Sequence, residues 1–180
     1  MRADAKRNYD QILAAAEAEI ARSGADASLE KIARDAGVGS ATLHRHFPSR
    51  QSLLEAVFHD RVEVLCAKAR ELSTAADPGR ALAGWLRDLA VFGATTRGLA
   101  EAMLYATPAV SDCEVMLRDA GGTLMRRAQA AGDVRADVAI DDLLTVANAV
   151  SLATRDATDA ARLVTLAIEG IGGPAGHSGG

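Results

Sequence analysis

Apolar residues recur at helical spacing along almost the whole chain, and no run alternates in the way that a half-buried strand requires. Glycines, prolines and capping residues divide this pattern into about nine helical segments. We expect these segments over residues 8–23, from Ser28 to Gly37, over 40–46, from Pro48 to about 74, from Asp77, after Gly98, from Thr107, from Ile140, and from Asp156 to Gly170. The pattern therefore predicts an all-α protein.

Several segment boundaries carry a recognisable capping signal. Ser28 is a suitable N-cap, and the pairs Asp77-Pro78 and Thr107-Pro108 each place proline at the first helical position after a capping residue. The pair Gly121-Gly122 falls inside the seventh segment. We expect it to interrupt or loosen that helix, either as a hinge or as a close packing contact.

The charge distribution changes near Pro48. Residues 1–50 hold eight Lys and Arg against seven Asp and Glu, a net +1, whereas residues 51–180 hold twelve against seventeen, a net −5. The total of −4 does not favour nucleic-acid binding, but an anion-binding face is expected in the first fifty residues. We predict a three-helix domain over 1–48, a helical bundle over 49–172, and a disordered Gly-rich tail over 173–180.

The stretch "SLEKIARDAGVGSATLHRHF" predicts a helix-turn-helix, in which the second helix lies in the DNA major groove. Gly37 is expected to supply a positive φ at the turn, and Val38 to fill the angle between the two helices. The inward-facing positions form a small predicted core: Ile12, Ala16, Ile32, Ala33, Leu43 and Phe47.

The positions left outside this core are the candidate DNA contacts, because most of them carry hydroxyls, imidazoles or guanidinium groups that donate to phosphate or approach base edges. The alternative is a solvated face on a purely structural unit. The candidates are Ser28, Ser40, Ala41, Thr42, His44, Arg45, His46 and Arg50.

This stretch resembles the N-terminal domain of the TetR family of transcriptional regulators. The family pattern is "IA-x-x-AGVS-x-x-T-(L/I)-Y-x-(H/Y)-F-x-(S/N)-K-x-x-L", and the resemblance covers roughly residues 8–58. The segment "ALAGWLRDLAVFGATTRGLAEAMLYA" more weakly resembles the C-terminal domain of an actinobacterial-type subgroup. The matching positions are Ile32, Ala33, Ala36, Gly37, Val38, Thr42, Leu43, His46, Phe47, Ser49 and Leu53.

Two positions depart from the family pattern: His44 stands where the family usually has Tyr, and Arg50 where it usually has Lys. The resemblance implies that the Tyr and Lys contact phosphates. Arg50 keeps the positive charge, whereas His44 keeps a donor but loses the reach of the phenol and titrates near neutral pH.

The last two predicted helices are apolar around most of their circumference, so we expect part of their surface to meet a second copy of the chain. Complete burial within one chain is the alternative. The resemblance also implies a homodimer interface at these helices, bringing two reading heads to a palindromic DNA operator. The candidate interface residues are Leu143, Val146, Val150, Leu163, Leu166, Ala167 and Gly170.

The bundle carries large apolar side chains that could line a ligand pocket or form ordinary core. The resemblance implies a repressor that is released by a small effector, and the apolar setting indicates an apolar or amphipathic molecule. The candidate effector contacts are Trp85, Leu89, Phe92, Met103, Tyr105, Met125 and Asn148.

The remaining motifs argue against other classes of protein. Neither a catalytic nor a nucleotide-binding motif is present, so we expect no enzymatic activity and no cofactor. Cys66 and Cys113 cannot form a thiol zinc site by themselves, and no metal is expected. No apolar run reaches membrane-spanning length, which favours a cytoplasmic protein. The alternatives left open are a helical protein-interaction module and a regulator that activates or needs no effector.

Overall fold

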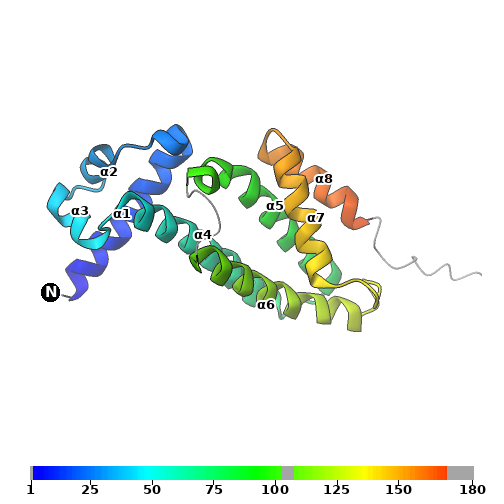
Figure 1. The fold of residues 1–180 in the computed structure, drawn as a ribbon. Helices are drawn as coiled ribbons and strands as arrows, with labels where there is room; N and C mark the ends of the chain where they lie inside the picture. The colour runs from blue at the N-terminus through cyan, green and yellow to red at the C-terminus, as the bar shows by residue number, and fades with distance from the viewer. Residues whose placement is uncertain (1, 103–107, 170–180) are drawn as a thin grey trace, which may run out of the picture. The chain divides into compact units, whose positions relative to one another are not determined.

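The structure, a computed structural model, describes residues 2–102 and 108–169, and the regular structure in these ranges is entirely helical (Figure 1). The all-α prediction is confirmed, and the eight α-helices found there are close to the nine expected. The elements are α1 (Arg2–Ser23), the 3₁₀ turn η1 (Gly24–Asp26), α2 (Leu29–Asp35), α3 (Ser40–His46), α4 (Arg50–Leu72), α5 (Pro78–Ala102), α6 (Pro108–Ala130), α7 (Ile140–Ala153) and α8 (Ala157–Glu169).

Three of the expected helix boundaries differ in the structure. Helix α1 begins at Arg2 instead of residue 8, since Asp4, Lys6 and Arg7 near its start are polar and exposed and leave no apolar periodicity to detect. Gly98 starts no separate helix, because α5 continues through it to Ala102. The expected break at Gly121-Gly122 is also absent, and α6 is continuous from Pro108 to Ala130.

The predicted capping residues act as expected wherever they are described. The Ser28 hydroxyl accepts from the Lys31 amide at 3.3 Å, and the carboxylate of Asp77 accepts from the Arg80 amide at 2.9 Å. Asp156 does the same at the start of α8. These side chains satisfy amide groups that a helix start otherwise leaves without an acceptor.

The chain forms two compact units. The N-terminal unit comprises Met1–Arg61 with Thr96–Ser111, and the C-terminal unit comprises Val62–Thr95 with Asp112–Gly180. The division thus falls inside α4 and not at Pro48, because Leu53, Leu54 and Val57 of α4 are buried in the N-terminal core.

The core of the N-terminal unit contains the residues predicted for it. Ile12 and Ala16 of α1 meet Ile32 and Ala33 of α2, and Leu43 of α3 joins them. Phe47 belongs to the same core, and Val38 packs against it at the turn between α2 and α3. This burial holds the two short helices, neither of which is long enough to be stable alone.

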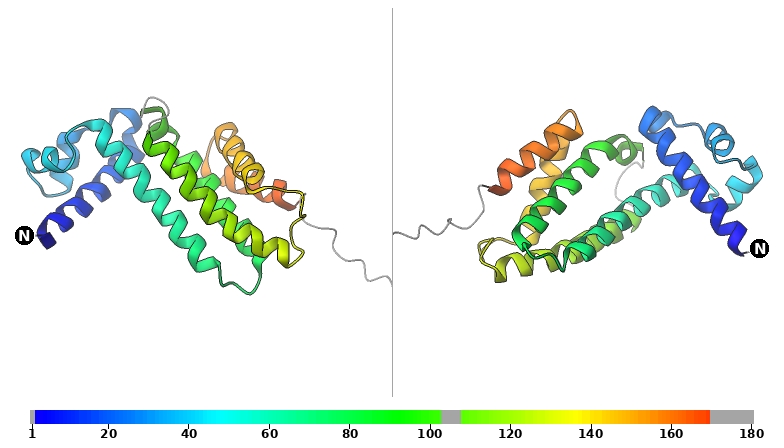
Figure 2. Two further views of the ribbon diagram at one scale, coloured as in Figure 1. Left: turned by 60° about the horizontal axis from the view of Figure 1, so that its bottom comes forward. Right: turned by 180° about the vertical axis from the view of Figure 1, so that it is seen from behind.

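The core of the C-terminal unit is organised around the single tryptophan. Trp85 is fully buried, and its indole nitrogen donates to the Leu65 carbonyl at 3.0 Å. A Cβ at Gly121 would lie 2.7 Å from the ring, so the glycine is where α6 lets the indole approach. Figure 2 shows α4 and α6 side by side, where the Cys66 thiol contacts the Met116 carbonyl at 3.6 Å.

Within residues 2–102 and 108–169, no helix combines the length and the apolar character needed to cross a membrane.

Candidate functional site

Helix α3 presents one buried side and one exposed side. Leu43 is 1% exposed and faces the core, whereas Ser40, Ala41, His44 and Arg45 are exposed. Thr42 and His46 are partly exposed. The six candidates on this helix therefore reach solvent together, as the sequence predicted. Whether they contact DNA remains a prediction.

The turn before α3 has the predicted geometry. Gly37 adopts φ +67°, a conformation that side chains rarely adopt. Its amide donates to the Arg34 carbonyl at 3.0 Å, and the Val38 amide donates to the Ala33 carbonyl at 3.0 Å. These bonds end α2 and direct Val38 into the core, which fixes the angle at which α3 leaves the turn.

Two side chains on α3 make contacts that orient them. Arg45 donates to the Thr42 hydroxyl at 3.3 Å, one helical turn away, so both lie on the same outer side. The His46 ring meets the Tyr9 ring edge-on, with centroids 6.1 Å apart. His46 therefore links the end of α3 to α1. The sequence reading missed Tyr9, whose position on α1 gave no indication of this contact.

The remaining two candidates lie at the start of α2 and the start of α4. Ser28 is the N-cap of α2 and is partly exposed. The guanidinium of Arg50 donates to the Ala27 carbonyl at 2.5 Å, a contact between residues 23 positions apart. The structure thus brings both candidates to the segment that precedes α2.

A charged cluster joins α1 and α2, and sequence reasoning did not identify it. The carboxylate of Glu19 is almost fully buried and accepts from Lys31 at 2.7 Å and from Arg22 at 2.8 Å. Asp35 accepts from Lys31 at 3.2 Å. The hydrogen bond from Lys31 lowers the pKa of Glu19, and the same bond raises the pKa of Lys31. Lys31 and Arg22 therefore form ion pairs within this unit.

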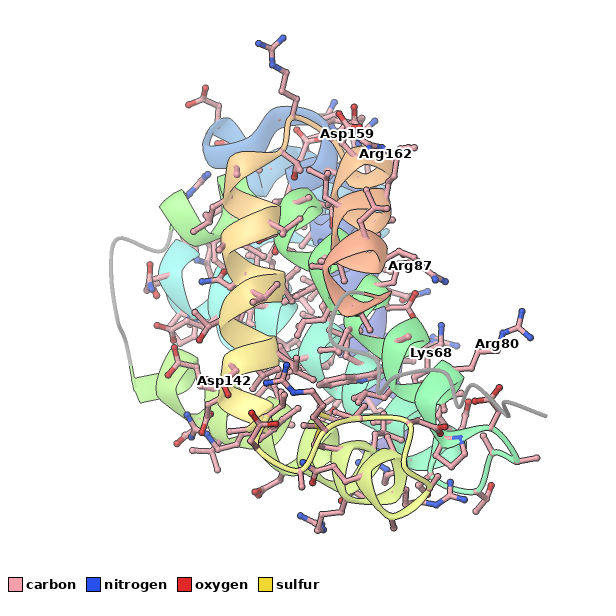
Figure 3. The ribbon with its side chains drawn as sticks, turned by 90° about the vertical axis from the view of Figure 1, so that its right-hand side faces the viewer. Lys68, Arg80, Arg87, Asp142, Asp159 and Arg162 are labelled. Carbon is pink, nitrogen blue, oxygen red and sulfur yellow. The ribbon has the colours of Figure 1, made fainter. Side chains whose placement is uncertain are left out.

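A second candidate surface lies on α7 and α8, which pack side by side in the C-terminal unit (Figure 3). Val146 and Leu152 on α7 are 39% and 60% exposed, and Leu163 and Leu166 on α8 are 36% and 55% exposed. Ala160 and Val164 of α8 instead face the core of the chain. This pair of helices therefore carries apolar side chains on both its inner and its outer side.

Charged side chains lie at the starts of α7 and α8 and beside α8. Figure 3 shows Asp142 at the start of α7, Asp159 and Arg162 near the start of α8, and Arg87 of α5 beside α8. Arg87 donates to the Thr165 hydroxyl at 3.1 Å, and Arg162 pairs with Asp159 at 3.2 Å. An apolar centre with a charged margin is the usual composition of a protein–protein interface.

The predicted interface residues divide into three groups. Val146, Leu163 and Leu166 are exposed, and Val150 and Ala167 are partly exposed. Leu143 is only 4% exposed because it already belongs to the core of its own chain, so it offers no surface to a partner. Gly170 lies outside the described residues.

The predicted effector contacts that fall within the described residues do not gather around an open pocket. Trp85 and Met125 are fully buried and Leu89 nearly so, all three in the C-terminal core, while Phe92 packs against it. Asn148 is exposed on α7, not directed into the bundle. Met103 and Tyr105 lie outside the described residues. The buried residues among the predicted effector contacts are thus part of the hydrophobic core.

A small hollow of about 50 Å³ lies between α5, α7 and α8. None of the effector contacts within the described residues lines it, and it is well below the several hundred Å³ that a drug-sized ligand needs. Its walls are Leu86, Leu143, Val146, Ala147, Val164, Ala167 and Ile168.

The two cysteines are buried free thiols. Burial raises the pKa of Cys66, and burial also raises the pKa of Cys113, to about 11. In the described ranges, no three His, Cys, Asp or Glu side chains come together in a way that could hold a metal ion.

The architecture and both halves of the sequence match known regulators. Residues 12–57 match the family of bacterial regulatory proteins called the tetR family, and residues 77–172 match the C-terminal domain of SbtR-like transcriptional regulators. The TetR transcriptional regulator SCO0520 from Streptomyces coelicolor is 34% identical. The match covers 92% of this chain and 99% of that one, with a TM-score of 0.78. This chain belongs to the TetR family of transcriptional regulators.

Further solved structures agree with this assignment to the TetR family. A TetR regulator from Mycobacterium vanbaalenii is also 34% identical, over 95% of this chain and 98% of that one, with a TM-score of 0.76. RolR, solved with the ligand resorcinol, shares the fold at 19% identity, with 97% and 92% of the two chains covered and a TM-score of 0.66. A comparison with curated proteins gives no match. The protein is therefore a DNA-binding transcriptional regulator with the helix-turn-helix that the sequence predicted.

Proposed function

We propose that this TetR-family regulator binds a palindromic operator as a homodimer, represses transcription there, and is released when a small apolar molecule binds its C-terminal unit. The observation that carries the proposal is the division of α3 into a buried apolar side and an exposed polar side. A helix held this way presents its outer side to a DNA major groove.

The proposed DNA contacts are the exposed and partly exposed side chains of α3. Thr42 and Arg45 share one side of the helix, because the guanidinium of Arg45 bonds to the Thr42 hydroxyl. Arginine at such a position pairs with a phosphate or with the edge of a guanine. Ser40, Ala41 and His44 are short enough for close approach to the groove. His46 is partly exposed beside the Tyr9 ring, and its exposed part could also contact the DNA.

The proposed homodimer forms through the outer side of α7 and α8. Leu152, Leu163 and Leu166 are exposed there, and burying such side chains against a second copy is favourable at about 25 cal/mol per Å² of apolar surface. In an isologous dimer both copies carry the same α3, and reading two operator half-sites one helical turn apart would require these helices to lie about 34–36 Å apart. Leu143 is left out of this interface because its own chain covers it.

The proposed effector enters the bundle of the C-terminal unit. The contact between Trp85 and Gly121 fills the space between α5 and α6, so a ligand binding there has to displace the indole. RolR was solved with resorcinol, which supports a small aromatic or apolar ligand for this fold. Release from DNA requires the effector to favour one conformation over the other, since equal binding to both shifts nothing.

Selection of random duplex DNA against the purified full chain tests this proposal. We expect enrichment of a palindrome whose half-sites are about one helical turn apart. Enrichment of a single unpaired half-site would contradict the dimer, and the absence of any enriched sequence would contradict specific operator binding. The selected operator then serves as the probe in a screen of small aromatic and apolar compounds, in which the effector is expected to lower affinity for DNA.

A further inference from the structure

The side chain of Arg50 is directed toward the interior of the N-terminal unit. It is partly buried, and its guanidinium donates to the Ala27 carbonyl at 2.5 Å. Arg45, the other arginine among the DNA-contact candidates, is exposed on α3. The two arginines therefore occupy different environments, although both are predicted as DNA contacts.

The Ala27 carbonyl is a buried acceptor at a sensitive place in the chain. Ala27 is 2% exposed and adopts a non-helical conformation with φ −52° and ψ 128° between η1 and α2. A buried carbonyl needs a donor, and here the guanidinium provides one. Ala27 immediately precedes Ser28, which caps α2 through the Lys31 amide and accepts from the Ile32 amide at 2.9 Å. The position of Ala27 therefore determines where α2 begins.

We propose that Arg50 is a positioning residue for DNA binding, which fixes the start of the helix-turn-helix from the first residue of α4, and that it does not act as a phosphate contact. This inference rests on the DNA-binding function described above. A guanidinium that holds a buried carbonyl orients α2, and α2 in turn orients α3 through the turn at Gly37.

The same contact makes the start of α2 depend on the start of α4. Leu53, Leu54 and Val57 anchor the first turns of α4 in the N-terminal core, so Arg50 extends from a rigid base. A shift of α4 at this end would carry the donor away from Ala27 and loosen the first turn of α2. Arg50 thereby links the orientation of the first turns of α4 to the placement of α3.

The salt dependence of DNA affinity separates positioning from phosphate contact. Arg50→Met keeps the length of the apolar stem and removes the donors, and Arg45→Met is the matched control on α3. A dimer that loses one phosphate contact per subunit lowers the slope of log K against log salt by about 1.8. We expect Arg50→Met to bind the selected operator about tenfold more weakly with an unchanged slope. We expect Arg45→Met to lower the slope, and a matching decrease for Arg50→Met would overturn the proposal.

Amide hydrogen exchange of the free protein gives a readout that needs no DNA. We expect the Lys31 and Ile32 amides to exchange faster in Arg50→Met and at the wild-type rate in Arg45→Met. Unchanged exchange in Arg50→Met would overturn the positioning role even if DNA binding itself is confirmed. Conversely, faster exchange in a chain that fails to bind DNA would count against the proposed function and not against this contact.

The wild-type protein provides a third test if Arg50→Met does not fold. A guanidinium bound to a buried carbonyl should give resolved side-chain NH signals in the free protein, and these should stay in place when the operator is added. Averaged Arg50 signals that become resolved only with DNA would show that the group is mobile until it meets phosphate, which would overturn the proposal.

Discussion

The Lys31 ammonium donates to the Glu19 carboxylate at 2.7 Å, so an ion pair joins α2 to α1 within the N-terminal unit. The acid is almost fully buried, and Arg22 and the Ser23 hydroxyl also donate to it. Because an acid that is buried with its partners is costly to leave unpaired, this cluster fixes the helix on which the turn and α3 are built.

The first prediction concerns the pH dependence of this ion pair. The pKa of Glu19 is lowered below its ordinary value of 4.5, chiefly by Lys31, so its contribution to stability is complete above that value and is lost as the pH falls toward the lowered pKa. The pKa of Lys31 is raised above 10.5, so the contribution of its ammonium group to stability is lost only in strong alkali. We expect Glu19→Gln to lower the Tm at neutral pH and the difference from wild type to shrink in acid. Thermal unfolding from pH 3 to pH 8 measures this, and a difference independent of pH would contradict it.

A second prediction uses the adjacent glycines of α6. Gly121→Ala should destabilise the protein by about 1–3 kcal/mol, because the new Cβ would lie 2.7 Å from the Trp85 ring. Gly122→Ala is the matched control, whose Cβ would meet only the flexible end of Arg126 at 3.4 Å. It should stabilise the helix by about 0.5–1 kcal/mol. Chemical unfolding followed by the fluorescence of the single tryptophan measures both, and equal effects would show that the close contact is absent.

The third prediction is that the outer side of α7 and α8 holds the dimer together. Leu166→Glu places a charge at a side chain that is 55% exposed on α8, and we expect it to produce monomers with much weaker operator binding. Val64→Glu on α4 is the control, since Val64 is 64% exposed outside this surface and should remain dimeric. Sedimentation velocity at micromolar concentration distinguishes the two. A monomeric wild type, or a dimeric Leu166→Glu, would argue against this interface.

The thiols give a fourth prediction. With its pKa raised to about 11 by burial, Cys113 carries almost no thiolate at neutral pH, and burial also raises the pKa of Cys66. Both should resist alkylation in the folded protein and react rapidly in denaturant. Mass spectrometry after brief iodoacetamide treatment at pH 7.5 counts the modified thiols, and rapid modification of the native chain would mean that this part of the core opens readily.

Local chemistry explains which features could be predicted from the sequence. The glycine at position 37 predicts a positive φ, and the serine at position 28 predicts a helix start. Both features depend only on residues that are neighbours in the sequence. Glu19 could not be identified this way, since a charged residue on an amphipathic helix is normally exposed and its partner Lys31 comes from another helix. The contact between Trp85 and Gly121 depends on how α5 packs on α6, so the glycine pair suggested a break that does not occur.

In the candidate site, too, contacts between residues far apart in the sequence could not be predicted. The exposed side of α3 follows from periodicity alone, and the structure places its residues as predicted. The direction of the Arg50 side chain does not follow from periodicity, because its acceptor is the backbone of a residue 23 positions away. Leu143 and Leu163 read alike in the sequence as apolar helix positions. Only the packing of α7 and α8 shows that the first is buried in its own chain.

Amide hydrogen exchange of the full chain, with and without its selected operator, tests most directly whether α3 reads DNA. We expect the operator to slow exchange most strongly in peptides that cover the turn at Gly37 and helix α3, with little change along the second half of α4. Slowing confined to other helices, with residues 37–47 unaffected, would show that the exposed side of α3 is not the surface that reads DNA.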